Sequence, residues 1–304
     1  MLREVILAVS RNDRVKAVVA GAPVSRNVVK RFVPGEGVDD AVRATTELLA
    51  SGRTVSLDHL GEDTLDAGQA ESTVKAYTLV LQRLADAGLA AGGRAEVSVK
   101  LTAVGQAIDQ SMALDNARTV CEAAREVGTT VTLDMEDHTT TDSTLQVLGE
   151  LRQDFPDTGA VVQAYLHRTE ADCRALAVEG SRVRLCKGAY QEPASVAFQS
   201  REDVDASYRR CLEVLMAGPG YPMVATHDPA LIALATELGR GRGRFEFQLL
   251  YGIRPQEQQR LAAEGHTVRV YVPYGDQWYG YFMRRLAERP ANVAFFLRSL
   301  ATRS

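Results

Sequence analysis

Cysteines are few and far apart in this chain of 304 residues. Only Cys121, Cys173, Cys186 and Cys211 are present, and no two of them form a CxxC pair. This spacing predicts neither a structural zinc site nor a disulfide framework. The sequence also lacks a signal-peptide pattern and any apolar run long enough to span a bilayer. We therefore expect a protein of the cytoplasm, with peripheral contact at the inner face of the cell membrane left open.

An excess of positive charge is also missing. The formal net charge is -4, so nothing attracts the whole molecule to phosphate backbones, and nucleic acid is not expected as a partner. No GxGxxG motif follows the first predicted strand. The glycine-dense run GRGRGR, residues 239–244, precedes a strand and is interpreted as a loop. A Rossmann-type NAD site is therefore disfavoured.

Short β-branched runs alternate with longer amphipathic ones along most of the chain. Eight candidate strands begin at residues 53, 96, 130, 160, 182, 221, 245 and 267. Their spacing leaves room for one helix each, a pattern typical of parallel βα units. We predict one catalytic domain over residues 1–304, with an N-terminal helical region (1–35) and a (β/α)8 barrel with C-terminal helices (53–304). An open doubly wound sheet is the main alternative.

Polar residues gather where the predicted strands end, which is the reactive face of such a barrel. Strand interiors are expected to be apolar, so the charges at Lys100, Arg184 and Lys187 need partners or a ligand. The other strand-end residues are Asp58, His59, Glu62, Thr102, Asp134, Glu136, Asp137, His138, Gln163, His167, Arg168, Tyr190, Thr226, His227, Asp228, Gln248, Tyr271 and Tyr274.

Two other chemistries fit single segments. LDMEDH at 133–138 groups three carboxylates and a histidine, but strand alternation would divide them between two faces, and no metal site is predicted. Lys100 or Lys187 could act as a Schiff-base nucleophile of class I aldolase type if its pKa were lowered by burial. A non-enzymatic amino-acid-binding barrel is a third hypothesis, which leaves the polar strand ends unexplained.

The stretch YGYFMRRLAE, residues 279–288, lies in a predicted helix after the last strand. Helical spacing places Tyr281, Arg284, Arg285 and Glu288 on one side. An exposed Arg284–Glu288 pair would stabilise the helix only slightly. Because the helix starts at the barrel mouth, we favour a clamp in which two arginines bind a carboxylate beside an aromatic wall.

Ten motifs in this order resemble proline dehydrogenases, the flavoenzymes that oxidise L-proline. They are FVPGE at 32, SLDHLGE at 56, VSVKLTAVG at 97, TLDMEDH at 132, VVQAYLHR at 161, RLCKGAY at 184, ATHD at 225, FEFQLLYG at 245, VRVYVPYG at 268 and YFMRRLAE at 281. The resemblance implies a distorted (β/α)8 TIM barrel with non-covalent FAD at its mouth. It also implies hydride transfer from proline to flavin N5, which gives Δ1-pyrroline-5-carboxylate, with a membrane quinone receiving the electrons.

The resemblance also implies a set of substrate residues. Lys100, Arg284 and Arg285 would bind the proline carboxylate. Tyr281 would line the far side of the pyrrolidine ring and favour proline over 4-hydroxyproline. Glu62 would pair with Arg284 as a gate over the substrate. The remaining residues implied on the substrate side are Tyr271 and Leu250 around the ring, Asp134 at the border of the site, and Glu288, which would hold an arginine.

For the flavin, the resemblance implies a second set of residues. They are Gln163, Arg184, Cys186, Lys187, Gly188, Ala189, Thr226, His227 and Gln248. Arg184 or Lys187 would stabilise the negative charge of the reduced flavin, because the redox chemistry belongs to the cofactor and its electrostatics to the protein.

One departure from the family's large bacterial members concerns the next reaction. Those members carry an aldehyde dehydrogenase domain that this sequence lacks, so the resemblance is to the monofunctional enzyme. We expect a separate pyrroline-5-carboxylate dehydrogenase. The segment NVAFFLRSLATRS, which begins at residue 292, is a lid, a dimer contact or a membrane contact, and these alternatives stay open.

Overall fold

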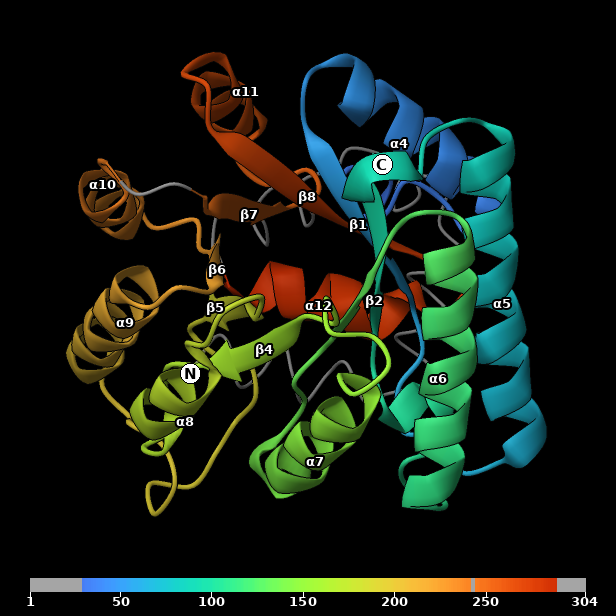
Figure 1. Ribbon diagram of the computed structural model, residues 1–304, viewed down its shortest axis with the longest axis horizontal. Coiled ribbons are helices and arrows are strands. Elements are labelled where there is room, and N and C mark those ends of the chain that lie inside the picture. The colour runs from blue at the N-terminus through green and yellow to red at the C-terminus, as the bar shows by residue number, and fades with distance from the viewer. Residues whose placement is uncertain (1–28, 242–243, 289–304) are drawn as a thin grey trace, which may run out of the picture.

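The computed structural model describes residues 29–241 and 244–288 (Figure 1). In the last helix, side chains are described as far as Arg285. The helices expected before residue 29, the segment after residue 288 and the side chain of Glu288 lie outside this description.

Eight parallel strands form the centre of the fold. They are β1 (Thr54–His59), β2 (Ala95–Val99), β3 (Val131–Leu133), β4 (Ala160–Gln163), β5 (Arg182–Cys186), β6 (Tyr221–Ala225), β7 (Glu246–Leu250) and β8 (Thr267–Tyr274). They follow the order β3-β2-β1-β8-β7-β6-β5-β4. Between β3 and β4, the described residues form an isolated bridge alone, from Thr132 to Gly159, the residue before β4. The sheet is therefore a nearly closed (β/α)8 barrel, and the predicted fold and its eight strands are confirmed.

The described helices lie around the barrel or across its end. They are α4 (Val38–Ala50), α5 (Ala67–Asp86), α6 (Gln110–Glu126), α7 (Thr141–Leu151), α8 (Thr169–Leu176), α9 (Arg201–Ala217), α10 (Pro229–Leu238), α11 (Pro255–Ala263) and α12 (Trp278–Glu288). Short 3-10 turns lie at η1 (Ala91–Gly93), η2 (Thr102–Val104) and η3 (His138–Thr140). Asp66, Asp109, Ser200 and Asp228 cap α5, α6, α9 and α10 by accepting hydrogen bonds from first-turn N–H groups.

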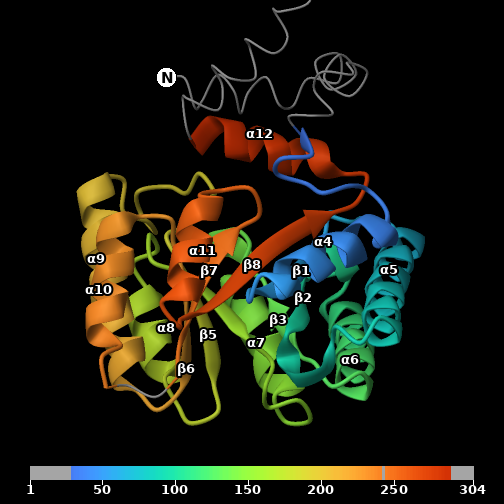
Figure 2. The same ribbon diagram turned by 90° about the horizontal axis from the view of Figure 1, so that it is seen from above.

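The helix after the eighth strand does not join the outer ring. α4, which precedes β1 in the chain, packs on β1 and β8 and occupies the place beside the last strand. α12 instead crosses the end of the barrel toward which the strands run (Figure 2). The barrel is distorted because α4 takes the place in the outer ring that the helix after β8 would otherwise fill. As a result, the two adjacent arginines of α12 lie over the mouth.

Side chains alternate along the strands between an apolar outer face and a polar inner one. On β2, Val97 and Val99 pack outward in the apolar cluster under the helices, while Glu96 and Ser98 face polar groups from other strands. The expectation of apolar strand interiors is therefore wrong for the inner face. The apolar core lies between sheet and helices, because alternate residues of a strand point to opposite faces.

A separate apolar cluster fixes α12 over the mouth. Phe282 is fully buried, and its ring centroid lies 6.1 Å from that of Phe32. Trp278 Nε1 donates to Glu36 Oε1 at 3.0 Å. The motif FVPGE, far away in sequence, thus packs against the helix that carries the arginines.

Candidate active site

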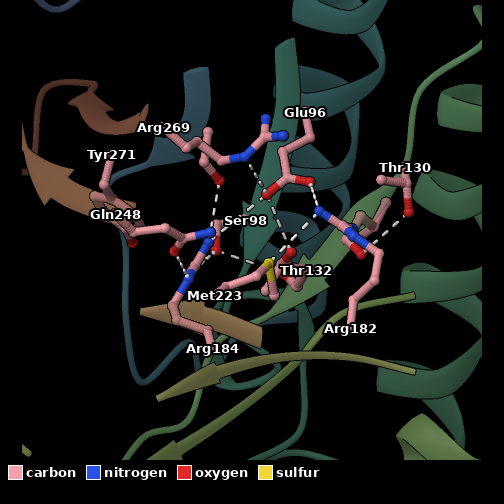
Figure 3. A network of polar contacts seen from close by, with 12 residues as sticks. Glu96, Ser98, Thr130, Thr132, Arg182, Arg184, Met223, Gln248, Arg269 and Tyr271 are labelled. Atoms are coloured by element: carbon pink, nitrogen blue, oxygen red, sulfur yellow. Dashed lines mark hydrogen bonds and ion pairs between the residues drawn. The ribbon is translucent and has the colours of Figure 1, made fainter. Parts of the chain in front are cut away.

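Arg184 is the central cation of the barrel mouth. It lies on β5 and is only 4% exposed. Its Nη1 donates to Asp134 Oδ1 at 2.6 Å. Nη1 also donates to Ser98 Oγ at 2.8 Å, and Nε donates to Gln248 Oε1 at 2.5 Å (Figure 3). These bonds come from several strands, so the guanidinium is held rigidly at the floor of the site.

A layer of buried ion pairs lies beneath this floor (Figure 3). Arg182 Nη2 is 2.6 Å from Glu96 Oε2, and Arg269 Nε is 2.8 Å from Glu246 Oε1. Burial alone would raise the pKa of Glu96, but Arg182, Arg269 and Arg184 together lower it to about 2. The carboxylate is therefore ionised, and paired charges fill the barrel axis below the site.

Lys100 and its partners occupy the substrate side. Its Nζ donates to Asp58 Oδ1 at 2.6 Å and lies 3.5 Å from Tyr271 Oη, which in turn donates to Asp134 Oδ2 at 2.7 Å. Burial alone would lower the pKa of Lys100, but Asp58, Asp134 and Glu62 outweigh burial and raise the pKa. A Schiff-base nucleophile needs the opposite shift, so Lys100 does not suit the aldolase hypothesis.

One oxygen of Asp58, Oδ2, has no hydrogen-bond partner among the described residues. The side chain is almost fully buried. An unpaired buried carboxylate oxygen is costly, which indicates that a polar ligand or a water molecule reaches this part of the site.

Lys187 and His227 lie on the side of the barrel opposite Lys100. Lys187 Nζ is 3.0 Å from Asp228 Oδ2 and also pairs with Asp205. His227 Nε2 accepts a hydrogen bond from the backbone N–H of Leu250 at 3.0 Å. That contact fixes the ring tautomer, with the proton on Nδ1.

The two arginines of α12 differ in their surroundings. Arg284 forms a two-point ion pair with Glu62, with Nη2–Oε1 at 2.6 Å and Nη1–Oε2 at 3.2 Å. The guanidinium of Arg285 lies 5.0 Å above the centre of the Tyr281 ring. The Glu62–Arg284 pair that the resemblance implied is present, and it bridges the β1–α5 loop and α12 across the mouth.

Glu136 is a buried carboxyl group between the two sides. Its oxygens accept from the N–H of Thr102 at 3.1 Å and from Thr102 Oγ1, while its backbone O accepts from Gln163 Nε2 at 2.7 Å. Burial raises the pKa of Glu136 to about 7, although the Thr102 bonds oppose the shift. The group therefore changes charge near neutral pH.

Most of the implied site residues meet at the mouth, but their protein partners were not predicted. Glu96, Ser98, Glu246 and Arg269 are absent from the implied set, and Asp58 was noted only as a polar strand end. A signal for them exists in the sequence. EVSVK, RVRLC, EFQLL and TVRVYV each alternate polar and apolar residues, which predicts a polar face toward the barrel axis.

Neither a metal-binding cluster nor a membrane-spanning helix is found in the part of the chain that the structure describes. Within residues 29–241 and 244–288, no three or more His, Cys, Asp or Glu side chains are grouped in a way that could hold a metal ion. Among the helices of that same part of the chain, none has the length and apolarity needed to cross a membrane.

Comparison with known proteins decides the family. A family model described as "Proline dehydrogenase" matches residues 41–298. The chain belongs to the proline dehydrogenase family. Its sequence is 38% identical over 304 residues to Proline dehydrogenase 1 of Bacillus subtilis (strain 168), with 99% of each chain covered. It is 42% identical over 283 residues to a proline dehydrogenase of Deinococcus radiodurans, with 90% of each covered.

A solved structure shares the fold of this family member. It is proline utilization A (PutA) from Bdellovibrio bacteriovorus, inactivated by N-propargylglycine, with a TM-score of 0.80 and 26% sequence identity. The match covers 87% of the present chain and 33% of that one. The likeness therefore concerns about a third of the longer protein. The family assignment agrees with the resemblance that the ten motifs carry.

Proposed function

We propose that this member of the proline dehydrogenase family uses non-covalent FAD to oxidise L-proline to Δ1-pyrroline-5-carboxylate and passes the electrons to a membrane quinone. The observation that carries the proposal is the arrangement of cations. Arg184 lies on the floor of the mouth, and Arg284 and Arg285 lie on the helix above it. Such a site suits an electron-accepting cofactor below and a carboxylate substrate above.

The residues at the floor fit a flavin. Arg184 is a buried cation, and Gln163 and Gln248 bring carboxamides of the kind that the polar edge of an isoalloxazine ring requires. Gln248 also bonds Arg184 and Glu246, and Gln163 bonds the backbone O of Glu136. With Arg184 and the two glutamines, Lys187, Thr226 and His227 would hold FAD. The bound cofactor would supply hydride acceptance at N5, and Arg184 would stabilise negative charge on the reduced ring.

The upper part of the site fits proline. Arg284, Arg285 and Lys100 would hold the carboxylate by charge-assisted hydrogen bonds. Fixing that end of the substrate would orient the pyrrolidine ring so that its C5 faces the hydride acceptor. Tyr271 and Tyr281 would limit the space around the ring. The amine must be neutral before hydride leaves, and we propose that its proton passes to water on binding.

The proposal also has consequences outside the site. Electrons would pass to a quinone during transient contact with the membrane surface. The product would be consumed by a separate dehydrogenase that oxidises pyrroline-5-carboxylate.

The decisive experiment is the visible absorption spectrum of the purified protein with FAD, before and after anaerobic addition of L-proline. An oxidised-flavin spectrum that bleaches on addition supports the proposal. A protein that shows no absorption of bound flavin after incubation with FAD would overturn the proposal. Borohydride trapping with a carbonyl substrate tests the remaining aldolase candidate, Lys187, because a Schiff base would be labelled covalently.

A further inference from the structure

The connection between β5 and α9, residues 187–200, carries part of the proposed flavin site. Lys187, Gly188 and Ala189 begin it. Backbone hydrogen bonds hold both ends of this connection against Tyr165, which lies two residues after the end of β4. Tyr165 N donates to Lys187 O at 2.9 Å, and Phe198 N donates to Tyr165 O at 2.8 Å. The middle of the connection lies outside any strand or helix. A backbone bond from His167 N to Val196 O at 2.9 Å holds its later part, and the position of the part before Val196 depends also on side-chain contacts.

Glu192 supplies such contacts. It is 8% exposed, and Oε1 accepts from the backbone N–H of His138 at 2.9 Å and from Tyr165 Oη at 3.2 Å. Its other oxygen contacts Nδ1 of the same histidine. A carboxylate is stable in a buried place only when donors replace its water, as they do here. Glu192 therefore joins its own connection to the segments that follow β3 and β4.

Tyr165 links this anchor to the flavin residues. Gly188 has a φ of +111°, and a Cβ at that position would lie 2.3 Å from Cδ1 of the Tyr165 ring. Only glycine permits both the backbone conformation and the close approach. The hydroxyl of Tyr165 donates to Glu192, and the ring of the same residue packs against Gly188. A shift of this ring would therefore move the backbone of Gly188, beside the proposed cofactor.

We propose that Glu192 is a positioning residue for FAD. By holding His138 and Tyr165, it keeps the 187–200 connection in the shape that presents Lys187 and Gly188 to the cofactor. The inference rests on the proposed function, since it places FAD at this mouth. Glu192 takes no part in the oxidation itself, so its loss acts on cofactor affinity.

The test compares FAD binding by the apoprotein and its variants, measured by equilibrium dialysis. Glu192→Ala removes all three contacts, and we expect FAD to bind about 10- to 100-fold more weakly. Glu192→Gln keeps an oxygen for the His138 N–H and gains an NH2 that can donate to the imidazole, so most of the affinity should remain. Tyr165→Phe removes only the hydroxyl that donates to Glu192, so its FAD affinity should lie between those of Glu192→Ala and Glu192→Gln.

A second readout needs no cofactor. Trypsin cleaves after lysine, and the bond between Lys187 and Gly188 lies at the start of the connection. If Glu192 holds this segment, apo Glu192→Ala should be cut there several-fold faster than the parent, since cleavage follows the population of open conformers.

A matched variant separates positioning from general loss of stability. Asp109→Ala removes the N-cap of α6, on a different strand-end connection, and should lower thermal stability while leaving FAD affinity and cleavage after Lys187 unchanged. The inference is overturned if Glu192→Ala binds FAD like the parent, or if Asp109→Ala weakens FAD equally. A parent protein that binds no FAD would overturn the proposed function, and the cleavage rates alone would then decide whether Glu192 anchors the connection.

Discussion

Arg284 and Glu62 are 222 residues apart in sequence and form a two-point ion pair across the barrel mouth. The side chains are 28% and 24% exposed, so solvent partly screens the pair and its own strength is modest. A pair of modest strength can open to admit a ligand and then form again. We infer that Arg284, while paired with Glu62 over the mouth, also faces the carboxylate of bound proline.

Loss of either arginine should therefore weaken proline binding. We expect Arg284→Met or Arg285→Met to raise the KM for proline about 10- to 100-fold, because each change removes a charge-assisted hydrogen bond of roughly 1.5–3 kcal/mol. Steady-state kinetics with an artificial acceptor measures the effect. Arg260→Met on the outer helix α11 is the control and should leave KM unchanged. An unchanged KM in both clamp variants would reject the assignment.

Substrate choice should depend on Tyr281. This side chain is 6% exposed and lies beneath the guanidinium of Arg285. Tyr281→Ser would open space and supply a hydroxyl, so the ratio of kcat/KM for 4-hydroxyproline to that for proline should rise. Tyr279→Ser, at an equally buried position of the same helix, should leave the ratio unchanged. If both variants move the ratio alike, the effect belongs to the helix and Tyr281 is not the wall.

Stability should fall with rising pH because of Glu136. Its pKa is about 7 in the folded chain against an ordinary value of 4.5. Between pH 4.5 and 7, Glu136 is protonated in the folded state and ionised in the unfolded state. Its contribution to the free energy of unfolding is therefore complete below pH 4.5 and is lost as the pH rises through 7. The shift corresponds to about 3 kcal/mol.

Glu136→Gln should remove this pH dependence. An amide can keep both contacts with Thr102, so the variant should match the parent near pH 4.5 and exceed its stability by about 1–3 kcal/mol at pH 8. Urea denaturation at several pH values measures the difference. Equal slopes of stability against pH in parent and variant would contradict the assignment.

The Lys100–Asp58 pair should show strong coupling in a double-mutant cycle. Asp58→Ala leaves a buried ammonium without its nearest partner, and Lys100→Met leaves a buried carboxylate. Each should cost about 3–5 kcal/mol of unfolding free energy. The double variant should cost clearly less than the sum of the two single changes. Additive costs from urea denaturation would show that the two charges do not depend on each other.

Much of the barrel was predictable from local patterns. The eight β-branched runs coincide with β1 to β8, because a strand's composition and its flanking turns are written in adjacent residues. The helix that carries Arg284 and Arg285 was predicted for the same reason. Alternation in EVSVK and RVRLC also predicts the polar inner face, which the general expectation of apolar buried strands conceals.

The sequence by itself determined which segments form strands and helices, where the strands end, and which residues carry the ten family motifs. Only the tertiary structure decided that α4 completes the outer ring and that α12 crosses the mouth. It alone paired Lys100 with Asp58 and placed Glu192 against His138 and Tyr165. The physical reason is that local propensity acts over a few residues, whereas closing a barrel brings together side chains that are tens to hundreds of positions apart.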